Sequence, residues 1–247
     1  MIIALRSILF YFGFALWTFL WGSVVLLFVL LPRGPRSWAC GFWGRVSVYW
    51  LRWACGVRFR VTGEENIPKC PCVIVANHQS ALETLLLWVI FRRISYVLKK
   101  ELFQIPVFGW ALRLSWPIGI DRRQGKRAMV QVLEEGKERL TAGFHVLIFP
   151  EGTRHPCGEV GEFSNTAAGL AVRARVPLLP VALNAGCFWP RDDWRKRPGI
   201  VEIRIAPPIM PGDDKAGVLT AKAHAWISQA VAQMDGGSAA PPPRPGA

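Results

Sequence analysis

The hydrophobic positions of this chain follow two different patterns, and the change between them falls near residue 56. No charged residue occurs between residues 7 and 32, and positions 8–31 are almost entirely apolar. After residue 56, short apolar runs alternate with segments in which apolar residues recur at helical spacing. The pattern predicts a membrane-anchoring helical segment over residues 1–56 and a folded domain over 57–235. The Gly- and Pro-rich remainder, 236–247, is predicted to be a disordered tail.

The first apolar run is long enough to cross a bilayer as a helix. A helix over residues 8–31 would extend about 36 Å, whereas the hydrocarbon core of a bilayer measures about 30 Å. A cleavable signal peptide is disfavoured, because its apolar part usually has only about 7–15 residues and ends at a small-residue cleavage site. The run ends instead in "LLPRGPR". Whether the helix spans the bilayer or dips into one leaflet stays open.

The segment 37–56 contains four tryptophans and two arginines. Tryptophan is enriched at membrane–water boundaries, so we expect an interfacial helix or the second leg of a helical hairpin. A plain core helix is the alternative.

Beyond residue 56, predicted strands and helices alternate. The predicted strands cover residues 57–61, 72–76, 94–98, 145–149, 178–184 and 200–206. The predicted helices cover residues 81–91, 125–141, 165–175 and 215–234. This alternation predicts an α/β fold with a mostly parallel sheet flanked by helices. In such sheets, functional residues gather at the carboxyl ends of the strands, where helix N-termini favour anions.

Charge and cysteine content narrow the possible partners. The net charge is +13, but no zinc-finger, RNP or basic-zipper pattern occurs, so no nucleic acid is expected as a partner. Beside an apolar anchor, the positive charge indicates contact with anionic membrane lipids. The six cysteines include no C-x-x-C pair and no cluster at zinc spacing. We therefore expect reduced thiols on the cytoplasmic side and no metal.

The stretch "ANHQSALET", residues 76–84, places His78 five residues before Glu83 at the end of a predicted strand. A carboxylate bonded to one imidazole nitrogen fixes the tautomer and leaves the other nitrogen as a general base for a hydroxyl. The alternative is structural. Ser80-x-x-Glu83 matches a capping box, which would only start the following helix. This stretch alone leaves both interpretations open.

Three further basic side chains stand out. Lys100 in "VLKKEL" and Arg154 in "FPEGTR" come at the ends of predicted strands, and Arg122 in "IGIDRR" follows another apolar run. Within the last motif, Gly152 permits close backbone approach and Thr153 offers a hydroxyl. Each basic group alone fits a solvated charge, but three at strand ends predict an anion site suited to phosphate.

The remaining histidines and motifs add little. His155 adjoins Arg154 as a candidate substrate contact, whereas His145 and His224 are expected to be structural. The sequence contains no nucleophile elbow, phosphate-binding P-loop, dinucleotide-binding or zinc-protease motif.

Taken together, these motifs resemble a known family. The chain carries, in order, the blocks "NHQSALE", "IDR", "FPEGTR" and "VPLLPVA". This order over residues 61–206 resembles the glycerolipid acyltransferases, and most closely their bacterial 1-acyl-sn-glycerol-3-phosphate acyltransferases. The family more often has aspartate where this chain has Glu83.

The resemblance implies roles for individual residues. His78 would be the general base and Glu83 would orient it. Arg154 and Arg122, with Lys100, would bind the substrate phosphate. The remaining matches are Glu151, Gly152 and Thr153, in the loop that binds the acceptor, and Val176, Pro177 and Pro180, near the acyl path.

The resemblance also implies an activity. It is transfer of an acyl chain from acyl-CoA or acyl carrier protein to the 2-hydroxyl of 1-acyl-sn-glycerol-3-phosphate (lysophosphatidic acid). The product would be phosphatidic acid for phospholipid synthesis, and no cofactor is expected. We expect the protein at the bacterial inner membrane, with its site facing the cytoplasm. The alternatives are an acyltransferase for another lysolipid, such as a lyso-ornithine lipid, and a non-catalytic protein that binds anionic lipid.

Overall fold

The computed structural model describes residues 1–235, so the predicted tail, 236–247, lies outside the described residues. The helices are α1 (Ile2–Leu26), α2 (Arg33–Cys55), α3 (Leu82–Ile90), α4 (Phe108–Leu114), α5 (Lys126–Thr141), α6 (Thr166–Ala174) and α7 (Ala216–Asp235). The strands are β1 (Val57–Thr62), β2 (Val73–Ala76), β3 (Ile94–Lys99), β4 (Ile118–Ile120), β5 (His145–Ile148), β6 (Leu178–Leu183) and β7 (Gly199–Ile205). Short 3-10 turns are η1 (Leu27–Leu30), η2 (Glu64–Asn66), η3 (Lys100–Gln104), η4 (Arg122–Gln124) and η5 (Ala185–Cys187).

The seven strands form one sheet in the order β1-β7-β6-β2-β5-β3-β4. Strands β6, β2, β5, β3 and β4 run parallel, whereas β7 is antiparallel to β6 and parallel to β1. The predicted α/β fold with a mostly parallel sheet is therefore confirmed. Helix α4 was not predicted, because Pro106 and Gly109 interrupt its apolar sequence; the helix begins just after this proline.

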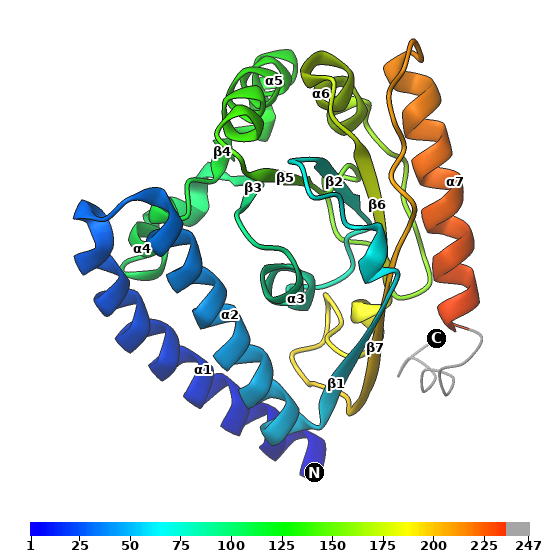
Figure 1. The fold of residues 1–247 in the computed structure, drawn as a ribbon. Coiled ribbons are helices and arrows are strands. Elements are labelled where there is room, and N and C mark those ends of the chain that lie inside the picture. Colours follow the sequence, from blue (N-terminus) through cyan, green and yellow to red (C-terminus); the bar gives the residue numbers. More distant parts are fainter. Residues whose placement is uncertain (236–247) are drawn as a thin grey trace.

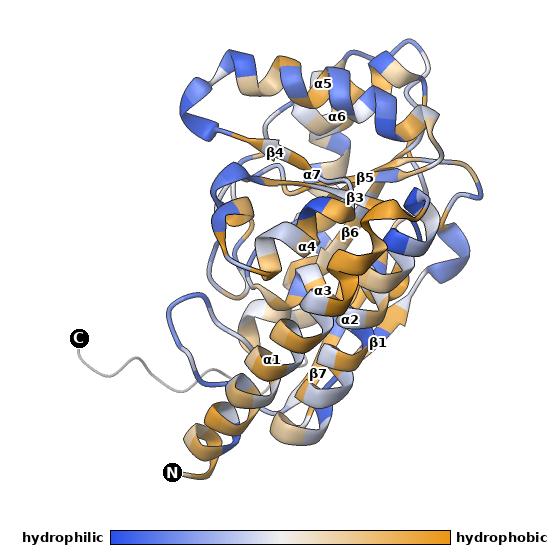
Figure 2. Ribbon diagram, turned by 90° about the vertical axis from the view of Figure 1, so that its left-hand side faces the viewer, coloured by the Kyte–Doolittle hydropathy of each residue, from blue (hydrophilic) through white to orange (hydrophobic). Residues whose placement is uncertain are grey.

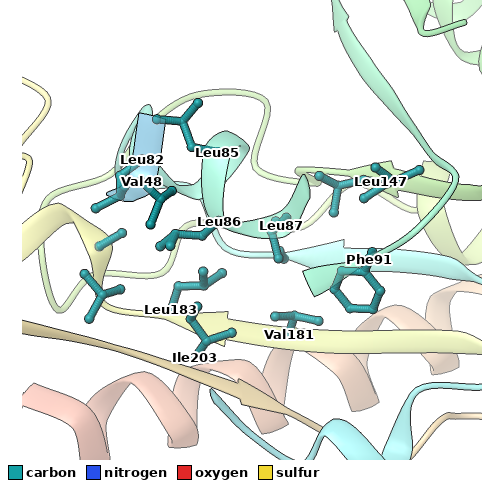
Figure 3. Close-up of a cluster of buried hydrophobic side chains, with 14 of the residues drawn as sticks. Val48, Leu82, Leu85, Leu86, Leu87, Phe91, Leu147, Val181, Leu183 and Ile203 are labelled. Atoms are coloured by element: carbon teal, nitrogen blue, oxygen red, sulfur yellow. The ribbon is translucent and has the colours of Figure 1, made fainter. Parts of the chain in front are cut away.

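Helices cover both faces of the sheet (Figure 1). Each face of the sheet carries its own hydrophobic core, and alternate residues of β6 point into one core or the other. Leu179 and Val181 face α3 and the N-terminal hairpin, whereas Leu178 and Ala182 face α5, α6 and α7. Figure 3 shows the first of these cores, where leucines of α3 meet side chains of β6 and β7. Complete burial of such a side chain contributes about 1.5–3 kcal/mol.

Glycine ends two of the helices that frame the domain. Gly56 follows α2 with φ of 72° and donates its N–H to the carbonyl of Arg52. Gly143 follows α5 with φ of 86° and donates its N–H to the carbonyl of Leu140. A left-handed residue at this position favours glycine, which has no Cβ to clash.

Helices α1 and α2 form an antiparallel hairpin beside the domain, and α2 packs on α3 (Figure 1). Gly44 allows this approach, because a Cβ at this position would lie only 3.3 Å from the carbonyl oxygen of Leu85 and 3.4 Å from the side chain of Trp88. The segment Ile2–Leu30 is, within the described residues, the one helix long and apolar enough to cross a membrane. Its outer face is exposed and apolar, as Figure 2 shows by its orange colour along α1.

Candidate active site

His78 and Glu83 form a directly bonded pair at the carboxyl end of β2. The His78 Nδ1 atom lies 2.7 Å from Glu83 Oε2, and the two side chains are 13% and 0% exposed. The His78 ring stacks on Phe149, with 4.1 Å between ring centroids. Next to the histidine, Asn77 locks the strand end, because its side chain donates to the carbonyl of Leu183 and accepts from the same residue's N–H. The imidazole therefore has a fixed position on the edge of the sheet.

Glu83 is held by three hydrogen bonds. Its Oε1 atom accepts the backbone N–H groups of Gln79 and Ser80 at 2.8 Å each, while Oε2 faces the His78 ring. The Ser80 hydroxyl accepts the N–H of Leu82, so the helix begins two residues after the expected cap. Burial raises the pKa of Glu83, and the hydrogen bonds from His78 and the backbone oppose this rise. The same carboxylate therefore accepts the backbone N–H of Ser80 at the helix start and contacts His78, despite its extra methylene.

The pair has a clear chemical consequence. A carboxylate on Nδ1 keeps the proton on that nitrogen, so Nε2 of His78 is the lone-pair nitrogen that can accept a proton from a hydroxyl. An imidazolium formed in this way would be stabilised by the carboxylate of Glu83.

Glu151, one of the residues predicted in the acceptor loop, contacts the backbone beside the His78–Glu83 pair. Its fully buried carboxylate accepts the backbone N–H of His78 at 2.7 Å and that of Gly161 at 2.9 Å. His155, the candidate substrate contact, places its Nε2 atom 3.3 Å from the same carboxylate, and its backbone N–H donates to the carbonyl of His78. Burial raises the pKa of Glu151. Through these bonds, the loop after β5 holds the backbone of His78 in place.

Arg122 and Lys100 lie on the same edge of the sheet. The Arg122 guanidinium donates to the carbonyl of Gly152, which brings the second and third blocks together beside His78. Lys100 Nζ lies 2.8 Å from Asp121 Oδ2, and Arg123 bonds to the same carboxylate. Hydrogen bonds from Arg123 and then Lys100 hold the pKa of Asp121 well below its usual range. Lys100 therefore already has a carboxylate partner, whereas Arg122 forms no ion pair with any residue in 1–235.

Arg154 is half-buried on the loop that follows β5. Its carbonyl accepts a hydrogen bond from Arg191, and within residues 1–235 its side chain forms no ion pair. Thr153, one residue earlier, is exposed. A guanidinium without a carboxylate partner remains available for an anion.

Val176, Pro177 and Pro180 lie elsewhere in the domain. The carbonyl of Pro177 accepts the N–H of Val73, the first residue of β2, so this end of β6 is the amino edge of the parallel sheet. Pro180 is buried within β6 and pairs in register with Val75. The structure does not bring these three residues together with His78.

Three site residues were missed by the sequence reasoning. Asn77 and Phe149 stand inside the quoted motifs, but their contacts are made to another strand and to the His78 ring. Asp121 was visible only as part of "IDRR", and nothing in the spacing indicates its bond to Lys100.

The prediction that all cysteines are reduced thiols was wrong for two of them. Cys157 and Cys187 form a disulfide, with 5.0 Å between their Cα atoms. They are 30 residues apart, so no local spacing rule finds them; the fold brings the loop after β5 next to η5. The other cysteines are Cys40, Cys55 and Cys72, which are buried, and Cys70, which is exposed.

The other histidines have structural partners. His145 Nδ1 lies 3.1 Å from Cys72 Sγ, and His224 Nε2 lies 3.1 Å from the carbonyl of Gly161. Among residues 1–235, no group of three or more His, Cys, Asp or Glu side chains is placed to hold a metal ion.

Comparison with known proteins places this geometry in context. The family model described as Acyltransferase matches residues 58–184. The chain is 42% identical to the 1-acyl-sn-glycerol-3-phosphate acyltransferase of Pseudomonas aeruginosa over 236 residues, which cover 94% of this chain and 92% of that one. It is 32% identical to the human 1-acyl-sn-glycerol-3-phosphate acyltransferase alpha over 168 residues, which cover 67% of this chain and 59% of the relative.

A solved structure has the same overall fold. The crystal structure of the 1-acyl-sn-glycerophosphate (LPA) acyltransferase PlsC from Thermotoga maritima matches with a TM-score of 0.80 and 27% identity, covering 96% of this chain and 98% of that one. Together with the matched family model, these relatives show that the chain belongs to the acyltransferase family.

Proposed function

We propose that this protein transfers an acyl chain from acyl-CoA or acyl carrier protein to the 2-hydroxyl of 1-acyl-sn-glycerol-3-phosphate. The observation that carries the proposal is the contact between His78 Nδ1 and the buried carboxylate of Glu83. The names of the Pseudomonas and human relatives support the choice of acceptor. The product would be phosphatidic acid, the precursor required for phospholipid synthesis.

The reaction needs one proton transfer in each direction. His78 Nε2 takes the proton of the acceptor hydroxyl, and the oxygen attacks the carbonyl carbon of the thioester. As the C–S bond breaks, the leaving thiolate takes the proton back from the imidazolium, so no covalent enzyme intermediate forms. General base catalysis of this kind accounts for about 10²–10⁴-fold in rate. Positioning of the two substrates supplies much of the rest.

Recognition of the acceptor is assigned to Arg122 and Arg154. Arg122 contacts the loop that carries Glu151, and Arg154 lies three residues further along the same loop. Two planar guanidinium groups near one imidazole suit a phosphomonoester, because each can form paired charged hydrogen bonds. Lys100 is already paired with Asp121, so it is a weaker candidate for a phosphate ligand than the two arginines.

The N-terminal hairpin is assigned to one leaflet of the bacterial inner membrane, with the site facing the cytoplasm. Near its start, α1 is tied to the domain, because Ser7 Oγ accepts the backbone N–H of Lys196. Near its end, α1 packs on α4, and a Cβ at Gly22 would lie 2.9 Å from the side chain of Val107. A helix whose two ends touch the same domain lies along the membrane surface instead of crossing to the far side.

Acyl transfer by the purified enzyme tests this proposal. A labelled acyl thioester is supplied with a panel of lysolipids: lysophosphatidic acid, lysophosphatidylcholine and a lyso-ornithine lipid. We expect lysophosphatidic acid to be acylated at least tenfold faster than the others, because only it carries the phosphomonoester. Equal rates on all three would overturn the phosphate assignment, and no transfer to any of them would overturn the proposed activity.

A further inference from the structure

A basic hollow lies where the hairpin turns from α1 into α2. It measures about 500 Å³ and is lined by Pro32, Arg33, Gly34 and Arg36 from the turn and by Arg93 and Phe144 from the domain. We call it the arginine hollow. Its volume falls in the range of ordinary small-molecule sites, which is about 300–1,000 Å³.

The arginine hollow is separate from the His78 site. Arg93 directly precedes β3 and Phe144 directly precedes β5. These strands run parallel to β2, so their first residues lie at the amino edge of the sheet, whereas His78 follows the carboxyl end of β2. A ligand in the hollow would therefore be on the opposite edge from the proposed reaction.

The charges in the hollow are of one sign. Among the described residues that line it, three are arginines and none is a carboxylate. Neither Arg33 nor Arg93 forms an ion pair with any described residue, and the Arg33 guanidinium is held 3.6 Å above the ring of Trp116. Arg36 is fixed by hydrogen bonds to the carbonyls of Leu31, at 2.7 Å, and Val29, at 2.5 Å. Three guanidinium groups gathered without an acid repel one another and favour an anion between them.

The surface beside the hollow decides which anion fits. Leu27, Leu30 and Leu31 come immediately before the turn and are 76%, 91% and 40% exposed. A free inorganic anion gains nothing from contact with exposed leucines. A lipid can place its phosphate on the arginines and its acyl chains along the apolar side chains. Guanidinium forks match phosphate oxygens in pairs, which gives such a contact both strength and orientation.

We propose that the arginine hollow binds the phosphate of a diacyl anionic phospholipid, as an accessory lipid site apart from the His78 centre. Arg93 and Arg33 supply the phosphate contacts, and the exposed leucines of η1 lie along the lipid chains. The site does not depend on the proposed acyl transfer, because a diacyl lipid with a phosphodiester headgroup lacks the free 2-hydroxyl and the phosphomonoester of the proposed acceptor.

Native mass spectrometry of the detergent-purified full chain with phosphatidylglycerol tests the site. Wild type is expected to retain one phosphatidylglycerol at least tenfold more tightly than phosphatidylcholine, and Arg93→Gln is expected to lose about tenfold of that affinity. Arg92→Gln is the matched control, because Arg92 is an exposed neighbour that does not line the hollow. Equal binding by wild type and Arg93→Gln would overturn the proposal.

Further measurements test whether the variants are folded and whether the bound phosphate belongs to a lipid or to a free anion. Arg33→Gln, tested separately, is also expected to weaken binding, so the result does not depend on one variant folding. Both variants are expected to acylate lysophosphatidic acid at the wild-type rate in neutral detergent, which reports an intact fold and keeps this test apart from that of the proposed function. Inorganic phosphate at millimolar concentration is expected to leave the bound lipid in place; displacement would show a free-anion site and contradict the lipid assignment.

Discussion

At the scale of single residues, the decisive contact is the one that sets the tautomer of His78. Glu83 Oε1 is occupied by two backbone N–H groups, so Oε2 alone faces Nδ1 of the ring. The sequence placed both residues at a strand end and proposed their pairing. The sequence alone could not distinguish a capping role from a catalytic one. The same carboxylate accepts backbone N–H groups at the start of α3 and contacts the His78 ring.

Glu83→Gln tests this tautomer. With the amide oxygen held by the backbone N–H groups of Gln79 and Ser80, the amide nitrogen would face His78 Nδ1 and could only donate to it. The proton on the His78 ring would then move to Nε2. That nitrogen would no longer have a free lone pair with which to accept the proton of a hydroxyl. We expect kcat to fall on the order of 10²–10⁴-fold, with the unfolding midpoint of the protein little changed. Steady-state kinetics and thermal unfolding measure the two effects, and a loss below threefold would argue against the assignment.

Arg154→Ala tests the phosphate contact at the same scale. The side chain of Arg154 has no ion-pair partner among residues 1–235, so its removal leaves no buried charge behind. A lost charged hydrogen bond is worth about 1.5–3 kcal/mol, so we expect KM for lysophosphatidic acid to rise at least tenfold while kcat changes little. Arg127→Ala, an exposed arginine at the start of α5, is the control and should leave KM unchanged. An unaltered KM in Arg154→Ala would leave Arg122 as the phosphate ligand.

At the scale of elements, the loops after β5 and β6 are joined in ways that local patterns do not show. Gln79 bridges them, because its amide donates to the carbonyl of Glu159 and accepts the N–H of Gly186. The disulfide between Cys157 and Cys187 joins the same two loops. Most strands and helices were predictable from their apolar periodicity, although β4 and α4 were not. Contacts between loops depend instead on strand order, which periodicity does not encode.

Replacing Cys157 with serine tests the disulfide. A disulfide that closes a loop of this size contributes about 2–4 kcal/mol, so the variant should unfold at a lower temperature than wild type without reductant. With excess reductant the two proteins should unfold alike. Cys70→Ser, which removes an exposed free thiol, should match wild type in both conditions. Identical midpoints without reductant would mean that the bond is absent in solution, as is common for cytoplasmic proteins.

Lys196 links the loop before β7 to α1 and makes stability depend on pH. Its amine is almost fully buried between the rings of Tyr11 and Trp189, with 4.2 and 4.1 Å to their centroids. Burial lowers the pKa of Lys196 from 10.5 to about 8. Between these two values the unfolded chain holds more protons than the folded one, so stability rises with pH across this window.

Lys196→Met should abolish that part of the pH dependence. The shift corresponds to about 3 kcal/mol, present as a cost below pH 8 and relieved as the pH approaches 10.5. We expect the difference in unfolding free energy between the variant and wild type to favour the variant at pH 7.5 and to shrink toward pH 10. Denaturant unfolding in detergent at several pH values measures it, and parallel pH curves for the two proteins would refute this account of Lys196.

At the scale of the whole molecule, the N-terminal hairpin packs directly against the domain, through contacts of α1 with α4 and of α2 with α3. The sequence predicted an apolar helix and a tryptophan-rich partner, but left open whether the first helix spans or dips. That choice depends on contacts far apart in the chain, such as those of Ser7 with Lys196 and of Arg33 with Trp116. No local hydrophobic pattern contains this information.

Cysteine labelling in sealed membrane vesicles tests the one-leaflet placement. A Cys70→Ser background receives either Ile2→Cys, at an exposed position, or Gly34→Cys, where an added Cβ meets no other atom within 4 Å. Because both ends of α1 touch the same domain, an impermeant thiol reagent should label both positions from the same side of the membrane. Labelling from opposite sides would mean that α1 crosses the bilayer.

The central claim is that His78 takes the proton of the acceptor hydroxyl. Its most direct test is a single-turnover measurement of acyl transfer from a labelled thioester to lysophosphatidic acid by wild type and by His78→Ala. We predict a rate at least about 10²-fold lower in the variant, with membrane binding and the unfolding midpoint retained. A folded His78→Ala protein that transfers the acyl chain within threefold of the wild-type rate would contradict it.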